Sequence, residues 1–174
     1  MMRKAEDILY IVIHTTAGFG SKESIERYWR EKLGWKDPGY HRLIDLDGKV
    51  HKLASFDKIT NGVRSYNEES IHISYIGGVD RNNVNKAVDT RTEAQKAAIL
   101  DCIYETITWL KDNGKDVSKD LMILGHRDFS KDKNGNGIID PHERIKECPS
   151  FNAIPEYNWI TYNEFNKKNK LPNK

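Results

Sequence analysis

The chain has 174 residues, of which 37% are hydrophobic and 31% charged, so it can form one core and is too apolar for a disordered chain. Its 28 basic against 26 acidic residues leave a net charge of +2, which excludes the basic field expected for binding nucleic acid or a membrane surface. Two cysteines cannot form a disulfide framework, and no apolar run is long enough for a membrane span or resembles a signal peptide. We therefore expect one soluble domain, residues 1–174, made in a reducing cytoplasm.

The first half of the chain contains signals for three strands and one helix. Ile8–Ile13 is a continuous run rich in β-branched residues, which is typical of a central strand buried on both faces. Ser24–Leu33 has apolar residues at helical spacing and predicts a short amphipathic helix. The strand-like runs His41–Leu46 and Lys49–Leu53 enclose an Asp-Gly pair, which predicts a hairpin with a two-residue type I′ turn.

The second half continues the alternation of strands and helices. Ser70–Ile76 alternates like a strand, and Thr92 begins a capping box that predicts a long helix ending near Asn113. Leu121–Leu124 is the last core strand, and Trp159–Phe165 indicates a short final helix. This order of elements predicts a single α/β domain with a central mixed β-sheet flanked by α-helices.

Three side chains at or beyond strand ends have the chemistry of a metal site. His14 directly follows the first strand, His126 follows the last core strand after one glycine, and Cys148 lies 22 residues further on. Active sites of α/β domains lie at such strand ends. Two imidazoles and a thiolate suit Zn²⁺, with a fourth position left for water as in catalytic sites. On these residues alone, two hydrogen-bonded histidines and a buried thiol remain an alternative.

Five separated stretches, in one order, add a wider pattern. They are Ile11–Ala17, Gly39–Ile44 leading to Asp47–Val50, Ser70–Gly78, Leu124–Asp128 and Lys146–Phe151. Together they resemble the zinc-dependent N-acetylmuramoyl-L-alanine amidases of type 2, which include the amidase-type phage lysozymes and the peptidoglycan recognition proteins. The resemblance spans roughly residues 8 to 152. It implies a mixed central sheet flanked by helices, and hydrolysis of the amide between N-acetylmuramic acid and L-alanine of the stem peptide.

The resemblance also implies roles for individual residues. His14, His126 and Cys148 match the family's zinc ligands, Tyr40 matches its active-site tyrosine, and Lys146 matches the lysine of the phage branch. We hypothesise that Tyr40 and Lys146 donate hydrogen bonds to the developing oxyanion or supply a proton to the leaving amine. Without the resemblance, Tyr40 would be interpreted as a loop aromatic and Lys146 as a solvated lysine.

The chain departs from the family pattern on one strand. Many members carry a glutamate where this chain has Ser74, and a glycine where it has His72, so a glutamate general base on this strand is excluded. His72 is either a substrate contact in the cleft or a strand histidine with ordinary hydrogen bonds. Trp35, shortly before Tyr40, is a candidate contact for glycan or peptide. Cys102, on the apolar face of the long helix, is expected to fill the core.

Residues 132–143 fit the twelve-residue EF-hand calcium loop, inserted between His126 and Cys148. The candidate oxygen ligands are Asp132, Asn134, Asn136, the Ile138 carbonyl, Asp140 and Glu143, with Gly137 at the sharp turn. Only the exit side has a helix signal, with Pro141 as first helical residue, so a solvated Asn/Gly turn is the alternative. A bound calcium would have a structural role and would support the segment that carries Lys146 and Cys148.

The sequence thus predicts a zinc-dependent peptidoglycan hydrolase, most like a phage or prophage endolysin. We expect a monomer that accumulates in the cytoplasm and reaches the cell wall after release; a toxin delivered by secretion would look the same. The main alternative is a non-catalytic peptidoglycan-binding module, which the complete set of three metal ligands argues against. A regulatory contact with another protein is a third hypothesis.

Overall fold

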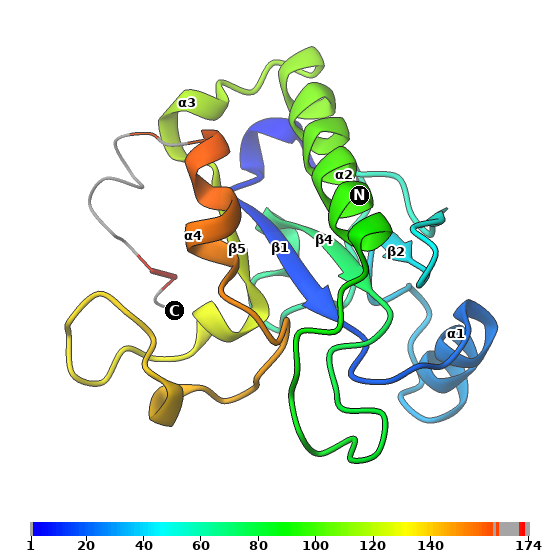
Figure 1. Cartoon of the computed structure of the whole chain (residues 1–174). Helices are drawn as coiled ribbons and strands as arrows, with labels where there is room; N and C mark the ends of the chain where they lie inside the picture. Colours follow the sequence, from blue (N-terminus) through cyan, green and yellow to red (C-terminus); the bar gives the residue numbers. More distant parts are fainter. Residues whose placement is uncertain (1, 162, 164–170, 173–174) are drawn as a thin grey trace.

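The computed structural model describes residues 2–161, 163, 171 and 172, and contains one five-stranded mixed sheet (Figure 1). The strands are β1 (Tyr10–Thr15), β2 (Arg42–Ile44), β3 (Val50–Lys52), β4 (Ser70–Tyr75) and β5 (Met122–Gly125). Their spatial order is β3-β2-β4-β1-β5, with only the β2–β3 pair antiparallel. The predicted fold class is confirmed, and β1 occupies a central position between β4 and β5.

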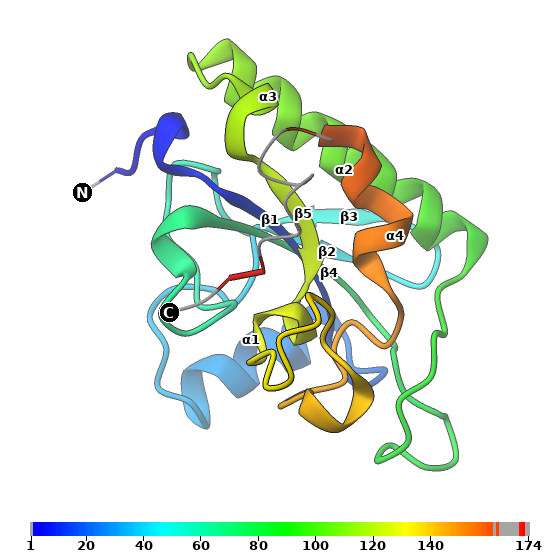
Figure 2. The same ribbon diagram turned by 90° about the vertical axis from the view of Figure 1, so that its left-hand side faces the viewer.

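Two helices cover one face of this sheet. α2 (Glu93–Asp112) and α4 (Ala153–Tyr157) lie on the same side of the strands, whereas α1 (Lys22–Glu31) lies beyond the carboxyl ends of the parallel strands (Figures 1 and 2). α3 (Val117–Asp120) is a single turn between α2 and β5 that the sequence did not predict. In the described part of the chain, no helix is both long and apolar enough to cross a membrane.

The alternation of side chains along the strands separates two environments. On β1, Ile11 and Ile13 join the main core beneath α2, whereas Tyr10 and Val12 join a smaller cluster on the opposite face. The predicted burial on both faces is therefore confirmed. The strand begins and ends two residues later than predicted, because ladder pairing with β4 extends through Thr15. His14 is consequently part of β1, where it pairs with Ser74 of β4.

The hairpin between β2 and β3 is confirmed, but its predicted type I′ turn is wrong. The turn runs from Asp45 to Gly48, whose N–H donates to the Asp45 carbonyl at 2.9 Å. Gly48 has a φ of +85° and is the residue in the left-handed region, while Asp47 is not. The Asp47 carboxylate instead accepts the N–H of Lys49 at 3.0 Å. This local bond favours an Asx turn over the mirror-image backbone that type I′ demands.

The two remaining helix predictions have different outcomes. Thr92 caps α2 as predicted, with the Thr92 hydroxyl accepting from the Gln95 N–H and the Gln95 side chain accepting from the Thr92 N–H. The final helix, α4, begins at Ala153 rather than at Trp159, because Ala153 and Tyr157 pack into the main core while Trp159 is 63% exposed. One 3₁₀ turn, Asn158–Thr161, follows α4. Of the predicted segment, residues 162, 164 and 165 lie outside the described residues.

A buried arginine joins the loop before α2 to α4. The Arg91 guanidinium pairs with Asp89 at 2.8 Å and with Glu156 at 2.9 Å, and lies 3.3 Å from the centroid of the Phe151 ring. Hydrogen bonds from Arg91 lower the pKa of the Asp89 carboxyl. Such bidentate pairs between charged groups are among the stronger polar contacts in proteins.

Candidate metal centre and cleft

Three side chains meet where β1 and β5 end. The Nδ1 atom of His14 is 3.2 Å from Nδ1 of His126 and 3.7 Å from Sγ of Cys148. The ligand atoms of the three residues all lie within 4.8 Å of one another. These are the three residues that the sequence predicted as metal ligands, and the fold brings them together from positions up to 134 residues apart.

Local structure explains how the two later residues reach His14. His126 begins a 3₁₀ turn directly after β5, and the N–H of Arg127 donates to the Cys148 carbonyl at 2.8 Å. Gly125 allows this approach, because a Cβ at this position would lie 2.5 Å from Cδ of Pro149. The segment that carries Cys148 can therefore lie directly against the end of β5.

Burial sets the protonation of these groups in the absence of a metal. Burial, and then the charges of His126 and Lys146, lower the pKa of His14 well below its usual value. Burial and the nearby Lys146 lower the pKa of His126 to about 4. Burial also raises the pKa of the Cys148 thiol to about 12, although a hydrogen bond from the Thr15 N–H opposes this rise.

The donor set fits a zinc ion. Two imidazoles held neutral offer nitrogen lone pairs, and a thiol loses its proton when it binds a metal. Nitrogen and sulfur donors with only three protein ligands are typical of catalytic rather than structural zinc. Within the described residues, the ligand atoms of His14, His126 and Cys148 form the one convergent group that combines nitrogen and sulfur donors.

A cavity of about 490 Å³ opens beside the three ligands. It is lined by Tyr40, Trp35, His126, Lys146 and Cys148, among others. Tyr40 lies against His14, with 5.1 Å between ring centroids, and burial raises the pKa of its hydroxyl, which keeps it protonated as a donor. Lys146 is exposed at the rim and forms no ion pair with the described residues.

The aromatic wall of this cleft comes from α1 and the loop that follows it. Trp35 stacks on Trp29, with ring centroids 6.3 Å apart and planes at 28°, and Trp29 contacts the Tyr40 ring at 5.4 Å. Tyr28 and Leu33, also on this wall, are 55% and 41% exposed. Trp35 thus faces the cleft, and its contact with a substrate stays a prediction.

His72 has a different place from the one expected of a substrate contact. Its side chain has no exposed surface and lies behind His14, where Nδ1 of His72 is 3.0 Å from Nε2 of His14. The structure therefore contradicts a contact in the cleft and favours the alternative of a hydrogen-bonded strand histidine. His41, beside Tyr40, could from the sequence be expected to orient in the cleft, but its buried ring instead stacks on His72 with planes at 26°. The only sequence signal that could have indicated this buried position is that His41 lies directly before β2.

The loop 132–143 folds around its own carboxylates. The Asp132 carboxylate accepts the N–H groups of Gly135 and Gly137 at 2.7 and 2.8 Å. Glu143 is buried and accepts N–H groups from Lys133, Asn134 and Asp140. The side-chain amides of Asn134 and Asn136 both donate to Asp140 Oδ2.

The exit side of this loop differs from the expectation. Ile138 is 64% exposed, whereas the next residue, Ile139, is buried. The expected exit helix is a single 3₁₀ turn, Pro141–Glu143.

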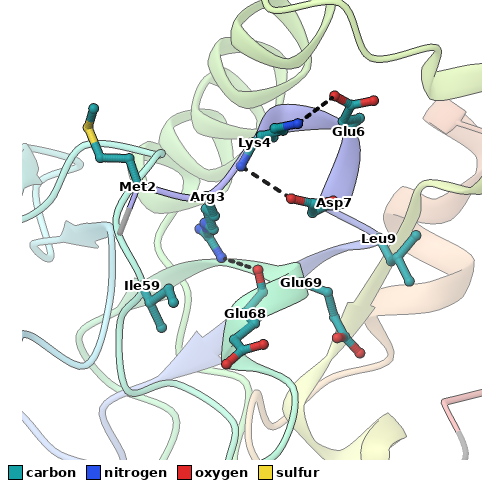
Figure 3. Close-up of a pocket in the computed structure, with 9 residues that line it drawn as sticks. All are labelled: Met2, Arg3, Lys4, Glu6, Asp7, Leu9, Ile59, Glu68 and Glu69. Atoms are coloured by element: carbon teal, nitrogen blue, oxygen red, sulfur yellow. Dashed lines mark hydrogen bonds and ion pairs between the residues drawn. The ribbon is translucent and has the colours of Figure 1, made fainter.

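A cavity larger than this cleft lies at the other edge of the sheet, at the amino ends of β1 and β4. Its volume is about 670 Å³. Figure 3 shows Met2, Ile59 and Leu9 around it among acidic and basic side chains. The Lys4 N–H bonds to the Asp7 carboxylate, and the Arg3 guanidinium donates to backbone carbonyls. None of its lining residues belongs to a convergent metal-binding group in the described part of the chain. Size alone therefore does not identify the functional site.

Comparison with known proteins places this fold and cleft in one family. Residues 4–149 match the model of the N-acetylmuramoyl-L-alanine amidase family. The chain belongs to this family, whose members include phage endolysins and peptidoglycan recognition proteins. Its function is accordingly that of a peptidoglycan amidase or a peptidoglycan recognition protein.

Individual relatives are distant. The chain is 26% identical to an endolysin of Enterobacteria phage K11 over 125 residues, which cover 72% of this chain and 67% of the endolysin. It is 31% identical to peptidoglycan-recognition protein SC2 of Drosophila melanogaster over 108 residues, 57% of each chain, so it spans just over half of that relative.

Among solved structures, the fold is similar to PGRP-SA of Apis mellifera, with a TM-score of 0.66 at 21% identity over 94% of this chain and 90% of that one. It is also similar to the N-acetylmuramoyl-L-alanine amidase LysC of Clostridium intestinale, with a TM-score of 0.61 at 16% identity over 92% and 88% of the two chains. At these sequence identities, the two solved structures support the assignment of the fold of this chain but not of its function.

Proposed function

We propose that this protein is a zinc-dependent N-acetylmuramoyl-L-alanine amidase that cleaves the amide between N-acetylmuramic acid and L-alanine of the peptidoglycan stem peptide. The convergence of His14, His126 and Cys148 at the head of an open cleft carries this proposal. A non-catalytic recognition module would not need a complete set of nitrogen and sulfur ligands beside a proton-donating tyrosine. The ligand set therefore favours hydrolysis over binding alone.

His14, His126 and Cys148 would hold the zinc ion. When bound, zinc supplies a Lewis acid and lowers the pKa of water to ~7. Two neutral imidazoles and one thiolate leave the centre with about one net positive charge, which favours the negative charge that develops on the amide oxygen. Burial of His14 strengthens this effect, because the charges interact through little intervening water.

Two other side chains would serve the reacting amide. The Tyr40 hydroxyl, kept protonated by burial, can donate a hydrogen bond to the oxyanion inside the cleft. The Lys146 ammonium at the rim can neutralise charge on the same oxygen or give a proton to the leaving amine. The stacked Trp29 and Trp35 offer a flat apolar surface for a sugar ring or the stem peptide.

The biological setting that we propose is that of an endolysin. Phage endolysins are among the relatives that match the chain. We propose a monomer that is made in the cytoplasm and acts on the cell wall after release.

The deciding experiment is mass spectrometry of the products from purified peptidoglycan. It compares native protein, zinc-stripped protein and Cys148→Ala. We expect intact stem peptides with a free L-alanine amino group, released by the zinc-loaded native protein alone. Sedimentation with peptidoglycan without any release would overturn the amidase and identify a recognition module.

We also propose that the loop 132–143 binds one calcium ion with a structural role. The order of its oxygen-bearing residues supports this, as does the φ of +83° at Gly137, the position that requires a sharp turn. The buried Glu143 lies folded back over the loop, at the place where an EF-hand loop has its bidentate glutamate. Calcium would replace the internal contacts of Asp140 and Glu143 and stabilise the segment that leads to Lys146.

A further inference from the structure

We propose that His72 is a positioning residue of the metal centre, which fixes the tautomer of His14 so that a bare Nδ1 faces the other two ligands. This inference rests on the proposed function, because it concerns the ligands of the proposed zinc ion. The resemblance to the family does not predict it, since many members have a glycine at this position.

The two rings form a buried contact between neighbouring parallel strands. His14 on β1 and His72 on β4 both point to the sheet face opposite α2, and they are 1% and 0% exposed. Nε2 of His14 lies 3.0 Å from Nδ1 of His72. A neutral imidazole has one donor and one acceptor nitrogen, so one ring must donate across this contact and the other accept.

A backbone amide determines which ring donates. The N–H of Val63 donates to Oδ1 of Asn67 at 2.7 Å, and a backbone N–H can only donate, so this atom is an acceptor. Nε2 of His72 lies 3.2 Å from the same oxygen and must therefore carry the proton. This leaves Nδ1 of His72 bare, ready to accept the Nε2–H of His14.

The consequence for His14 is a defined tautomer. With its proton on Nε2, His14 presents a lone pair from Nδ1, the atom that lies 3.2 Å from Nδ1 of His126 and 3.7 Å from Sγ of Cys148. The opposite tautomer would place a hydrogen where a metal ligand needs a lone pair. The hydrogen-bonded chain Val63–Asn67–His72–His14 thus prepares His14 for a metal before any metal binds.

The surroundings of His72 exclude other partners. The Gly62 backbone lies over its ring so closely that a Cβ there would be 2.3 Å from Cγ of His72. Gly62 also lines the cleft and so separates His72 from a substrate. On the strand, the His72 N–H donates to Nδ1 of His41 at 3.0 Å. Water and substrate therefore cannot compete with His14 for Nδ1 of His72.

An imidazole acceptor has a specific electrostatic effect. Outer partners of metal-binding histidines are commonly carboxylates, carbonyls or water, and their removal typically costs ~10–100-fold in metal affinity or activity. A carboxylate would add a negative charge behind the ligand. Neutral His72 orients His14 without that charge, so the centre keeps the net positive charge on which the proposed chemistry depends.

The test measures zinc affinity and the His14 tautomer separately. His72→Phe keeps a ring but removes the acceptor, whereas His72→Asn keeps an acceptor near the Nδ1 position. His51→Phe is the matched control, since His51 is a strand histidine bonded to Asp45 away from the ligands. Zinc dissociation constants come from competition with a chromophoric chelator. Nitrogen-15 shifts of the histidine rings in zinc-stripped protein report which nitrogen carries the proton.

We expect His72→Phe to weaken zinc binding ~10–100-fold and to shift His14 from the Nε2–H form to a mixture. We expect His72→Asn to recover most of the affinity and His51→Phe to change neither readout. Should His72→Phe fail to fold, Asn67→Ala removes the terminal acceptor and Asn67→Asp retains it, with the same expected contrast. Unchanged zinc affinity and an unchanged His14 tautomer in a folded His72→Phe would overturn the inference.

The two proposals fail in different ways. If native protein does not bind zinc, the proposed function fails, yet the ring shifts of stripped protein still test the tautomer. If native protein binds zinc and cleaves peptidoglycan while the tautomer is independent of His72, only the positioning role is wrong.

Discussion

The two ends of the parallel strands border cavities of opposite character. We call the end where β1 and β4 begin the amino edge, and the end where β1 and β5 finish the carboxyl edge. The amino edge has the larger cavity, about 670 Å³, and the cavity at the carboxyl edge has about 490 Å³. At the amino edge, Arg3 donates to the carbonyls of Asn67 and Ser70 at 2.8 and 2.6 Å and so serves the fold. At the carboxyl edge, Tyr40 and Lys146 line the cavity that lies beside the three convergent ligand atoms of His14, His126 and Cys148. The comparison teaches that convergence of donors, rather than volume, distinguishes the cleft that we propose as the active site.

The largest effect should come from removing a ligand at the carboxyl edge. Cys148→Ser is expected to lose zinc and to reduce turnover to background, because a hydroxyl is a poor substitute for a thiolate on zinc. Metal content by atomic spectroscopy and release of stem peptides measure this. Cys102→Ser is the matched control. Because Cys102 is buried in α2, this substitution should lower the free energy of unfolding by ~1–3 kcal/mol, yet the variant should keep zinc. Full activity of Cys148→Ser would contradict the assignment.

The next effect should separate chemistry from metal binding. Tyr40→Phe is expected to reduce kcat by ~10²–10³, the usual cost of removing one donor to an oxyanion, while zinc stays bound. Lys146→Met should act in the same direction. Kinetics on a soluble muropeptide together with zinc content measure the split. Loss of zinc from Tyr40→Phe would show that the tyrosine supports the ligands instead of the substrate.

The effect of calcium at the carboxyl edge should be smaller than the effects of these substitutions on activity. At a calcium concentration one hundred times Kd, the free energy of unfolding should rise by about 2.7 kcal/mol, observed as a higher Tm. Glu143→Gln should abolish this rise, and magnesium serves as the ion control. If millimolar calcium neither raises the Tm nor produces heat in calorimetry, the loop is a solvated turn.

A pH series should show a weaker charge effect near the same edge. The unfolded pKa of an aspartate is ~3.9, and Arg91 holds the pKa of folded Asp89 below its usual value, so the folded state binds fewer protons. The stabilisation that Arg91 gives to ionised Asp89 is present above the unfolded pKa and is lost as the pH falls through the lower, folded pKa. Native protein should therefore lose more stability than Asp89→Asn between pH 6 and pH 3 in urea unfolding. An equal loss would exclude this pair as a source of acid sensitivity.

The smallest effect belongs to the amino edge. Glu68→Gln, at an exposed side chain, should leave zinc affinity and turnover unchanged and alter stability by no more than ~0.5 kcal/mol, as for most surface substitutions. Activity assays and thermal unfolding measure both. A large loss of activity would break the distinction between the two edges.

Hydrophobic patterns make strand ends visible, and His14 and His126 stand at two of them, but only the resemblance to the amidase family favoured them, with Cys148, as a ligand set. The sequence could not predict the role of His72, since period-2 alternation gives the face of a residue but not the ring that lies opposite. The start of α4 was missed for a related reason. Ala153 is core because of tertiary contacts with distant residues, which local propensity does not record.

The separation of His14 and Cys148 along the chain has a consequence for synthesis. His14 is among the first residues of the domain to leave the ribosome, and Cys148 follows 134 residues later. A nascent or prematurely terminated chain can form β1 and still lack the sulfur ligand. If the proposed zinc site is correct, completion of nearly the whole domain would be a precondition for metal loading, and unfinished copies would be inert.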